Sequence, residues 1–393
     1  MRIAVNTRFL LPGRLEGIGW YIHEILRRIV EAHPEDEFIF FFDRPYDTSF
    51  LYRPNVRPVV LFPPARHPIL WYAWFEWAVP RVLKQYQPEV FFSPDGYLSL
   101  KAKTPTLLTV HDIIPLQEPE SIPWAPRIYY RHFLPRYIRK ATCIVTVSEH
   151  VQRLIIDSMG LPPARVQLVY NGYRAIFRPL STTEKQVVQA KYSNGAPYFL
   201  HVGAIHPRKN VARLIEAFDI FKALTKSPIK LLLAGRMAWQ SEPVRKALQK
   251  AQYRADIRIL GYVSDAELAR LCGAALALVN VSLNEGFGLP TVEALACDTP
   301  VLCSNHPALA EVAGDAALFV HPKSVEEIAR GLKQLAESPA LRQALVEKGR
   351  VQRQQFCWNA AAQQIYQLLQ QTAGGDLSGE ATLLRNRPLS STE

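Results

Sequence analysis

Cysteine is scarce in this chain of 393 residues, and its five cysteines show no paired spacing. They are Cys143, Cys272, Cys297, Cys303 and Cys357, mostly inside apolar runs and without a CxxC pair or a histidine-rich neighbour. This pattern argues against a disulfide framework and against a zinc site. We therefore expect a protein of a reducing cytoplasm.

Long apolar stretches are missing as well. No run reaches the roughly 18 apolar residues that a membrane-spanning helix needs. Residues 1–17, MRIAVNTRFLLPGRLEG, lack the long apolar core and the cleavage site of a secretion signal. We therefore expect that the protein neither spans a membrane nor is exported.

The length and the charge set broad bounds on what is present. A chain of 393 residues is too long for one core to grow comfortably, so we expect two domains of about 150 to 200 residues each. A share of 48% hydrophobic and 21% charged residues indicates an ordinary globular protein. The net charge of +11 fits nucleic acid, an anionic membrane surface or phosphorylated substrates, and charge alone does not choose among them.

Short β-branched or aromatic runs alternate with helical patterns along the whole chain. This alternation is typical of βαβ units and a parallel sheet. The first half has candidate strands at residues 2–6, 37–42, 56–62, 90–94, 106–110, 143–147 and 166–170. The second half has candidate strands at residues 198–203, 229–235, 257–263, 275–281, 300–304 and 316–320. The predicted fold class is α/β, with two doubly wound halves.

The domain boundaries follow from changes in composition. We expect an N-terminal domain at residues 1–177, a polar linker at 178–197 and a C-terminal domain at 198–355. Residues 356–374 form an amphipathic pattern, which we expect to be a helix that packs back on the N-terminal domain. Residues 375–393 are polar and rich in Gly and Ser, so we expect a disordered tail.

Helix starts are predicted within the second half. Asn210 precedes an apolar face and is a candidate N-cap. Ser264 with Glu267, and Ser324 with Glu327, have the spacing of capping boxes.

The stretch at residues 284–305, NEGFGLPTVEALACDTPVLCSN, follows a candidate strand and opens a helix. Ligands of parallel sheets bind at this edge, where exposed amides at a helix start attract anions such as phosphate. Glycines at Gly286 and Gly288 allow close approach of a ligand, and Pro290 suits the start of a helix.

Two carboxylates flank that helix start. Glu285 precedes the amides and Glu293 lies about one turn inside the helix. Carboxylates hold adjacent sugar hydroxyls well, so a phosphate with a sugar on each side, as in a nucleotide sugar, is one interpretation. The alternative is that Glu293 only complements the helix dipole and Glu285 is a solvated turn residue.

A second strand end carries adjacent cations. In HVGAIHPRKN, residues 201–210, Arg208 and Lys209 lie just before a helix start, a position that suits a diphosphate leaving group. Two basic residues in a loop are more often plain surface charge. Their position at the same predicted sheet edge as Glu285 favours the functional interpretation.

The stretch at residues 284–305 resembles the E-x7-E signature of the retaining glycosyltransferases of family 4, in the mannosyltransferase-like group. Five further segments resemble motifs of that family in the same order, besides HPRKN: GIGWYIHEIL (17–26), TVHDIIP (109–115), YNGYRAIF (170–177), EVAGDAALFVHP (311–322) and FCWNAA (356–361). The resemblance implies a GT-B architecture, in which two Rossmann-like doubly wound domains face each other across a cleft.

The resemblance also implies roles for individual residues. Glu285 would contact the transferred sugar, Glu293 would hold the nucleotide ribose, and Arg208 and Lys209 would neutralise the departing diphosphate. His111 would lie near the transferred sugar and the acceptor. The remaining implied contacts are made by backbone near the phosphates and sugar, at Gly17, Gly19, Gly286, Phe287, Gly288 and Leu289. Without the resemblance, a lone histidine at a strand end, such as His111, is more often a structural residue.

We expect a reaction without a metal or a cofactor. No DxD pair follows a candidate strand, so no magnesium-diphosphate site is predicted. We expect front-face retaining transfer of a hexose to a glycan or lipid-linked acceptor, with mannose from GDP-mannose as the first choice. The alternatives are glucosyl or galactosyl transfer from a UDP- or ADP-sugar, a nucleotide-sugar epimerase, and a sugar phosphorylase of the same fold.

One departure from the family pattern stands at Ala204. Some members carry an arginine directly after the VG pair that here is Val202 and Gly203. The expected cations are then Arg208 and Lys209 alone.

A basic and aromatic segment in the first half suggests a further partner. Residues 121–140, SIPWAPRIYYRHFLPRYIRK, contain five Arg or Lys residues and no acidic residue, in a helical pattern. Residues 67–80 form a second aromatic-rich patch. Such a helix fits an anionic membrane surface, which would place the protein on the cytoplasmic membrane face. The alternative is aromatic core with arginines on a solvated face.

Two other classes of protein fit the sequence less well. A dinucleotide dehydrogenase would need a tight GxGxxG after the first strand, where this chain has NTRFLLPGRLEGIGWY. A nucleic-acid binder is suggested only by the charge, and no motif of that class is present. We therefore expect no nucleic-acid partner.

Overall fold

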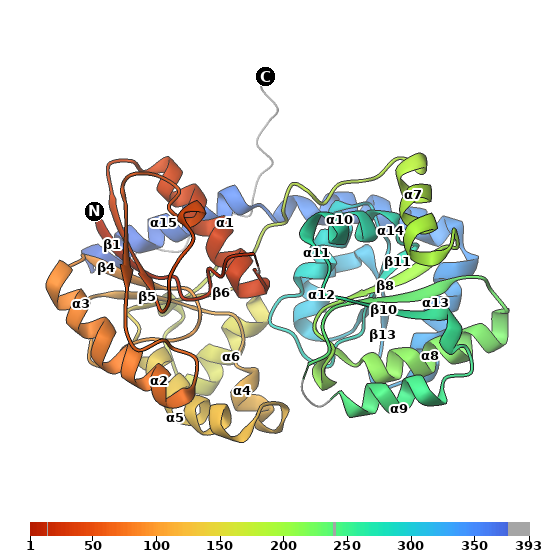
Figure 1. Ribbon diagram of the computed structural model, residues 1–393, viewed down its shortest axis with the longest axis horizontal. Helices are drawn as coiled ribbons and strands as arrows, with labels where there is room; N and C mark the ends of the chain where they lie inside the picture. Colours follow the sequence, from red (N-terminus) through yellow and green to blue (C-terminus); the bar gives the residue numbers. More distant parts are fainter. Residues whose placement is uncertain (14, 239–240, 376–393) are drawn as a thin grey trace. The chain divides into compact units, whose positions relative to one another are not determined.

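The computed structural model describes residues 1–13, 15–238 and 241–375. The chain divides into two compact units. The first unit contains Met1–Gly172 together with the chain from Cys357 onward, and the second contains Tyr173–Phe356. Figure 1 shows both units, each with a parallel sheet between layers of helices. The tail predicted at 375–393 lies outside the described residues, apart from Gly375.

The first unit is built on a seven-stranded parallel sheet in the order β3-β2-β1-β4-β5-β6-β7. Its strands are β1 (Arg2–Asn6), β2 (Glu37–Phe42), β3 (Val56–Val60), β4 (Val90–Ser93), β5 (Thr106–Val110), β6 (Cys143–Thr146) and β7 (Val166–Leu168). Its longer helices are α1 (Gly17–Ala32), α2 (Pro68–Ala73), α3 (Val79–Tyr86), α5 (Trp124–Lys140), α6 (Glu149–Met159) and α15 (Trp358–Gly374), with the short α4 (Ile114–Gln117) and the π-helix η2 (Trp74–Ala78). Helices cover both faces, which is why most of the strands are continuous apolar runs.

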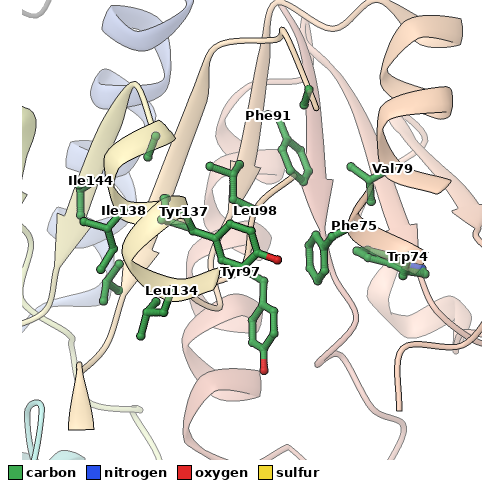
Figure 2. Close-up of a cluster of buried hydrophobic side chains, with 14 of the residues drawn as sticks. Trp74, Phe75, Val79, Phe91, Tyr97, Leu98, Leu134, Tyr137, Ile138 and Ile144 are labelled. Atoms are coloured by element: carbon green, nitrogen blue, oxygen red, sulfur yellow. The ribbon is translucent and has the colours of Figure 1, made fainter. Parts of the chain in front are cut away.

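Aromatic side chains dominate the core under α2, η2 and α5. Trp74 and Phe75 from η2, Tyr97 from the loop after β4 and Tyr137 from α5 are buried in one cluster (Figure 2). The ring of Phe75 stacks on that of Tyr97 with centroids 5.4 Å apart. The hydroxyls of Tyr129 and Tyr137 lie 2.6 Å apart, so these buried phenols satisfy each other.

The terminal helix α15 belongs to the first unit, where it runs beside α1 (Figure 1). Arg28 of α1 donates to the side chain of Asn359 at 2.6 Å. A Cβ at Gly172 would come within 2.3 Å of the backbone nitrogen of Trp358, so glycine is required where the chain enters and leaves this unit.

The second unit is built on a six-stranded parallel sheet in the order β10-β9-β8-β11-β12-β13. Its strands are β8 (Tyr198–Val202), β9 (Lys230–Ala234), β10 (Ile257–Gly261), β11 (Ala277–Asn280), β12 (Val301–Ser304) and β13 (Ala317–Val320). Its helices are α7 (Thr182–Ser193), α8 (Val211–Thr225), α9 (Glu242–Lys250), α10 (Asp265–Ala274), α11 (Leu289–Ala296), α12 (Pro307–Ala313), α13 (Val325–Glu337) and α14 (Pro339–Gln352). Every strand predicted from the sequence is present in one of the two sheets, with ends that differ by two residues at most.

The segment expected to be a linker, residues 178–197, is a folded part of the second unit. It contains α7, whose start is fixed by a complete capping box between Ser181 and Glu184. Tyr192 of this helix donates to Glu267 of α10 at 2.5 Å, and the side chain of Leu180 packs against Gly273. The segment is polar because α7 exposes most of its surface, and polarity alone did not distinguish it from a linker.

Two of the predicted caps differ in detail from the structure. Asn210 precedes α8 but makes no capping bond, because it is left-handed (φ 61°) and its amide donates to carbonyls of Val281 and Pro322. Ser324 accepts from the Glu327 amide at 3.1 Å, while the Glu327 carboxylate accepts from the amide of His321 instead of closing a box. The box between Ser264 and Glu267 is complete.

The capping box of α7 allows a direct test of this correction. Ser181→Ala removes the acceptor for the Glu184 amide and should lower the free energy of unfolding by about 1 kcal/mol. Thr183→Ala, one position before Glu184 on the exposed surface, is the control and should change it by less than about 0.5 kcal/mol. Urea denaturation measures both, and equal stabilities would mean that the segment behaves as an unfolded linker.

Candidate active site

Two loops meet at the carboxyl edge of the second sheet. β8 and β11 pair directly, so the loops that follow them, residues 203–210 and 281–288, lie side by side. The amide of Leu283 donates to the carbonyl of Arg208 at 2.8 Å and joins the two loops. In an open parallel sheet such an edge is where ligands bind.

Glu285 is held by two cations from the neighbouring loop. Arg208 Nη1 donates to Glu285 Oε2 at 2.8 Å and also to the Asn284 carbonyl at 2.8 Å. Lys209 Nζ donates to the other oxygen, Oε1. The side chains of Arg208, Lys209 and Glu285 are 19%, 12% and 8% exposed, respectively. One carboxylate is therefore shared by two partly buried cations.

The protonation states around Glu285 follow from burial and from these cations. Burial alone would raise the pKa of Glu285, but the charges of Lys209 and Arg208 outweigh it and hold the pKa well below its usual range. Burial and the neighbouring cations lower the pKa of His206 to about 4, and burial with Lys209 does the same for His201. The site therefore carries an ionised carboxylate, two cations and neutral imidazoles at neutral pH.

Glycine is required at two positions of these loops. Gly203 has φ 139°, and a Cβ there would lie 3.2 Å from Cε of Lys209, so its absence lets the lysine cross the end of β8. Gly288 has φ 100°, and a Cβ there would come within 2.4 Å of the Leu309 side chain. The glycine at 288 therefore sets the start of α11 against α12.

A buried polar network supports the loop that carries Glu285. Ser282 donates to Asn280 at 2.9 Å, Asn280 donates to Thr291 at 3.2 Å, and Ser304 donates to the Ser282 carbonyl at 2.8 Å. Asn280 is 4% exposed and the other three are fully buried. The sequence analysis did not single out these residues, although polar side chains directly after buried strands are a usable signal.

Glu293 lies inside α11, the helix that follows Glu285, and has different partners. Its Oε1 accepts from Arg174 Nη2 at 2.9 Å, and Arg174 Nη1 donates to Asp265 at 2.5 Å. The side chains of Arg174 and Glu293 are 8% and 10% exposed. Burial raises the pKa of Glu293 to about 7, because the attraction of Arg174 offsets only part of the desolvation and Asp265 adds repulsion.

Arg174 and Asp265 were missed by the sequence analysis. Arg174 lies 119 residues from Glu293 along the chain, and only its place in YNGYRAIF marked it at all. A single arginine inside an apolar segment is a weak signal for a buried ion pair. The guanidinium also lies over the ring of Phe177, 4.8 Å from its centroid.

Gly17 and Gly19 lie in the first turn of α1, not in a loop. A Cβ at Gly19 would come within 2.8 Å of the Phe9 carbonyl, whereas a Cβ at Gly17 would meet open space. Packing of α1 on the loop after β1 therefore explains Gly19. The two residues form a helix N-terminus, and their backbone contact with a donor stays a prediction.

His111 follows β5 at the carboxyl edge of the first sheet. Its Nε2 lies 2.8 Å from the carbonyl of Pro94, and a carbonyl only accepts, so Nε2 carries the proton. Burial lowers the pKa of His111 below its ordinary value. A neutral imidazole with a protonated Nε2 has Nδ1 as its hydrogen-bond acceptor.

The loop that holds His111 is fixed by a buried ion pair that sequence reasoning missed. Arg8 Nε donates to Asp95 at 2.5 Å, with side chains 4% and 0% exposed. The Arg8 guanidinium also lies 3.8 Å from the centroid of Tyr97. Asp95 adjoins Pro94, so this pair fixes the carbonyl that orients His111.

The structure thus brings together only part of the predicted set. Arg208, Lys209 and Glu285 contact one another, while Glu293 pairs with Arg174. The ring centroids of Phe287 and Phe356 lie 5.7 Å apart, and the Phe287 side chain is buried in the second unit. The other predicted residues of that unit, Gly286, Gly288 and Leu289, form the turn into α11, and His111, Gly17 and Gly19 belong to the first unit.

Within the described ranges, one group of three potential metal ligands was found: His33, Glu35 and Asp36. These residues precede β2, at the opposite edge of the first sheet from His111. The Tyr366 hydroxyl donates to Asp36 at 2.7 Å, and the His33 ring stacks on Tyr366. The group is thus accounted for by packing of α15.

Two Rossmann-like domains, with a cation-held glutamate before a helix start, are the architecture of the GT-B fold. Residues 15–175 match the family described as Glycosyltransferase Family 4, and residues 182–352 match Glycosyl transferases group 1. The chain is 32% identical over 291 residues to O-antigen chain mannosyltransferase B of Escherichia coli, covering 73% of this chain and 76% of that protein. It belongs to glycosyltransferase family 4.

Other similar proteins agree with this assignment. O-antigen chain mannosyltransferase RfbU of Salmonella typhimurium is 27% identical, over 69% of this chain and 72% of that protein. The structure of sucrose-phosphate synthase from Thermosynechococcus elongatus superposes with a TM-score of 0.78 at 19% identity, covering 95% of this chain and 100% of that one. WaaG, a glycosyltransferase involved in lipopolysaccharide biosynthesis, has a TM-score of 0.74 at 16% identity, covering 93% and 99%.

The pKa of Glu293 predicts a dependence of stability on pH. A folded-state pKa near 7 lies above the unfolded value, so the stabilising effect is complete at low pH and is lost as the pH rises. Relative to Glu293→Gln, the wild type should lose about 3 kcal/mol between roughly pH 4.5 and 7, and no more above that range. Urea denaturation across pH tests this, and parallel stability curves would show that Arg174 keeps Glu293 ionised throughout.

Proposed function

We propose that this glycosyltransferase transfers a hexose from a nucleotide sugar, with the donor bound at the carboxyl edge of the second sheet. The observation that supports this most is the pair of cations, Arg208 and Lys209, that hold Glu285 directly before α11. The cations match a diphosphate, and the carboxylate matches sugar hydroxyls. Glu293, further along α11, takes the nucleotide ribose.

Mannose from GDP-mannose is the proposed donor. The support is the name of two relatives that the chain matches over most of their length, both O-antigen chain mannosyltransferases. The corresponding acceptor is a growing glycan or a lipid-linked sugar of surface polysaccharide assembly. A UDP-sugar is the alternative, since a structural neighbour with a TM-score of 0.71, HepE of Anabaena, was solved with UDP and glucose.

The proposed chemistry is front-face transfer with retention of configuration, without a metal or a cofactor. The bond from the anomeric carbon to the phosphate oxygen breaks, and the acceptor oxygen bonds to that carbon on the same face. The departing phosphate takes the acceptor proton while Arg208 and Lys209 stabilise its developing charge. His111, neutral with Nδ1 as acceptor, receives a sugar hydroxyl hydrogen bond. A glycosyl-enzyme adduct seen by mass spectrometry would contradict this scheme.

An epimerase or a phosphorylase of the same fold is the alternative reaction. Both would use the same cations and carboxylates on a sugar phosphate, so the geometry of the second unit does not separate them from a transferase. Product analysis does, because only a transferase makes a new glycosidic bond to an added acceptor. The mannosyltransferase names of the relatives favour transfer.

The donor proposal predicts a stabilisation that depends on the nucleotide. GDP-mannose at 100 times its dissociation constant should raise the free energy of unfolding by about 2.7 kcal/mol. A thermal-shift panel of GDP-, UDP- and ADP-sugars measures it, and no shift with any of them would contradict the proposal.

The two glutamates should have separate effects on the reaction. In steady-state assays Glu293→Ala should mainly weaken nucleotide binding and Glu285→Ala should mainly lower turnover. Equal effects on nucleotide affinity would contradict the separate roles.

We further propose that the enzyme works in the cytoplasm, on an anionic membrane surface. None of the helices in the described part of the chain is long and apolar enough to cross a membrane. The solvent-facing side of α5 carries two bulky apolar residues, Trp124 and Ile128, which are 74% and 62% exposed. Further along the same side the exposed residues are His132 and four cations, Arg131, Arg136, Arg139 and Lys140. The helix contains no acidic residue.

Helix α2 lies beside α5 (Figure 1) and continues into η2, and both α2 and η2 also expose apolar residues. Tyr72 of α2 lies 5.7 Å from Phe133 of α5 and 5.9 Å from Trp77 of η2, measured between ring centroids. Ile69 and Trp77 are 72% and 61% exposed. Tryptophan beside arginine is the composition of a helix that lies in the interface of an anionic bilayer.

Vesicle co-sedimentation tests this surface. The wild type should bind vesicles of phosphatidylcholine with phosphatidylglycerol, and binding should weaken with salt and in vesicles of phosphatidylcholine alone. Trp77→Ser with Trp124→Ser should lose most of the binding. The control pair is Val187→Ser with Leu224→Ser, two residues of the second unit that are each 64% exposed. An equal lack of binding to both kinds of vesicle would contradict the proposal.

A further inference from the structure

The end of β9 lies directly beside the cation loop of the second unit. β8 and β9 pair in parallel with Val202 opposite Ala234, so the residues after each strand lie next to each other. The Gly203 amide donates to the Ala234 carbonyl at 2.9 Å. The next residues of the β9 strand end are Gly235 and Arg236.

The two strand ends stay paired beyond the strands themselves. The amide of Ile205 donates to the carbonyl of Arg236 at 2.9 Å, and the amide of Ala238 donates to the carbonyl of Ile205 at 3.0 Å. Gly235 has φ 155°, and a Cβ there would lie 1.9 Å from the Gly203 carbonyl oxygen. The backbone of Arg236 is therefore fixed against the loop that carries Arg208 and Lys209.

The positive charges of three side chains act on His206 in this loop. The charges that oppose protonation of His206 are those of Arg208, Lys209 and Arg236, and the acid that favours it is Glu285. Arg236 is half-buried. It thus adds its charge to the same local field as the two cations that hold Glu285.

A charge count shows why a third cation matters for this reaction. Arg208 and Lys209 supply two positive charges, and Glu285 cancels one of them. The diphosphate of a nucleotide sugar bears one negative charge on each phosphate, and the leaving nucleoside diphosphate gains another. Two cations and one carboxylate therefore leave the diphosphate undercompensated, whereas a third cation matches the charge of the bound donor.

We propose that Arg236 is a third donor-phosphate cation, which supplies from the end of β9 the charge that Ala204 does not supply after β8. This inference rests on the proposed nucleotide-sugar function. Arg236 acts on the phosphates together with Arg208 and Lys209, and its contribution grows as the leaving group gains charge. A guanidinium suits this role because it donates two parallel hydrogen bonds to a phosphate.

The test compares anions with and without the diphosphate. Calorimetry measures the affinity of GDP, UDP, ADP, inorganic pyrophosphate and guanosine for the wild type, Arg236→Ala and Arg236→Lys. Arg236→Ala should weaken binding of pyrophosphate and of the preferred nucleoside diphosphate about tenfold, with guanosine unchanged. Arg236→Lys should recover part of the loss. Arg245→Ala, which removes a charge from the exposed side of α9, is the matched control and should change none of these affinities.

The outcomes separate this inference from the donor proposal. Unchanged diphosphate and pyrophosphate binding in Arg236→Ala would overturn the role of Arg236, and so would an equal loss for guanosine. If the wild type binds pyrophosphate through Arg236 but binds none of GDP, UDP and ADP, the cation site stands and the nucleotide-sugar proposal fails. If the wild type binds neither pyrophosphate nor a nucleoside diphosphate, both are overturned.

Discussion

One buried carboxylate and its two cations organise the carboxyl edge of the second sheet. Glu285 meets Arg208 and Lys209 only because β8 and β11 are neighbours in the second sheet, which places their loops side by side. Partly buried cations need a partner charge, and Glu285 provides it. We infer that a donor phosphate bound at this edge would compete for the same cations and would release the carboxylate toward the sugar.

The residues around this cluster serve to hold it in place. Left-handed Gly203 gives Lys209 its path, and the buried network of Asn280, Ser282, Thr291 and Ser304 fixes the loop that carries Glu285. The first unit uses the same device at its own sheet edge, where Arg8 and Asp95 fix the loop that orients His111. In both units a buried charge pair or polar network, rather than the apolar core, defines the position of the candidate site residues.

The sequence predicted the sheets well and the site only in part. Buried parallel strands are continuous apolar runs, so their positions are readable without neighbours. Helix α7 was taken for a linker because it is polar, although the Ser181 and Glu184 spacing signalled a helix start. Arg208, Lys209, Glu285 and Glu293 were found from local motifs. The pairing of Glu285 with both cations and of Glu293 with Arg174 was not found, because these pairs join residues 76 or more positions apart and only the fold shows which charges meet.

We infer that the Glu285 carboxylate and a donor phosphate compete for Arg208 and Lys209. Calorimetry of GDP and UDP binding to the wild type and to Glu285→Gln measures this competition most directly. The variant keeps the shape of Glu285 but releases the charge of Arg208 and Lys209. Glu285→Gln should bind the nucleoside diphosphate more tightly than the wild type and should transfer the sugar more slowly. Weaker or unchanged binding of the nucleoside diphosphate by Glu285→Gln would contradict this inference.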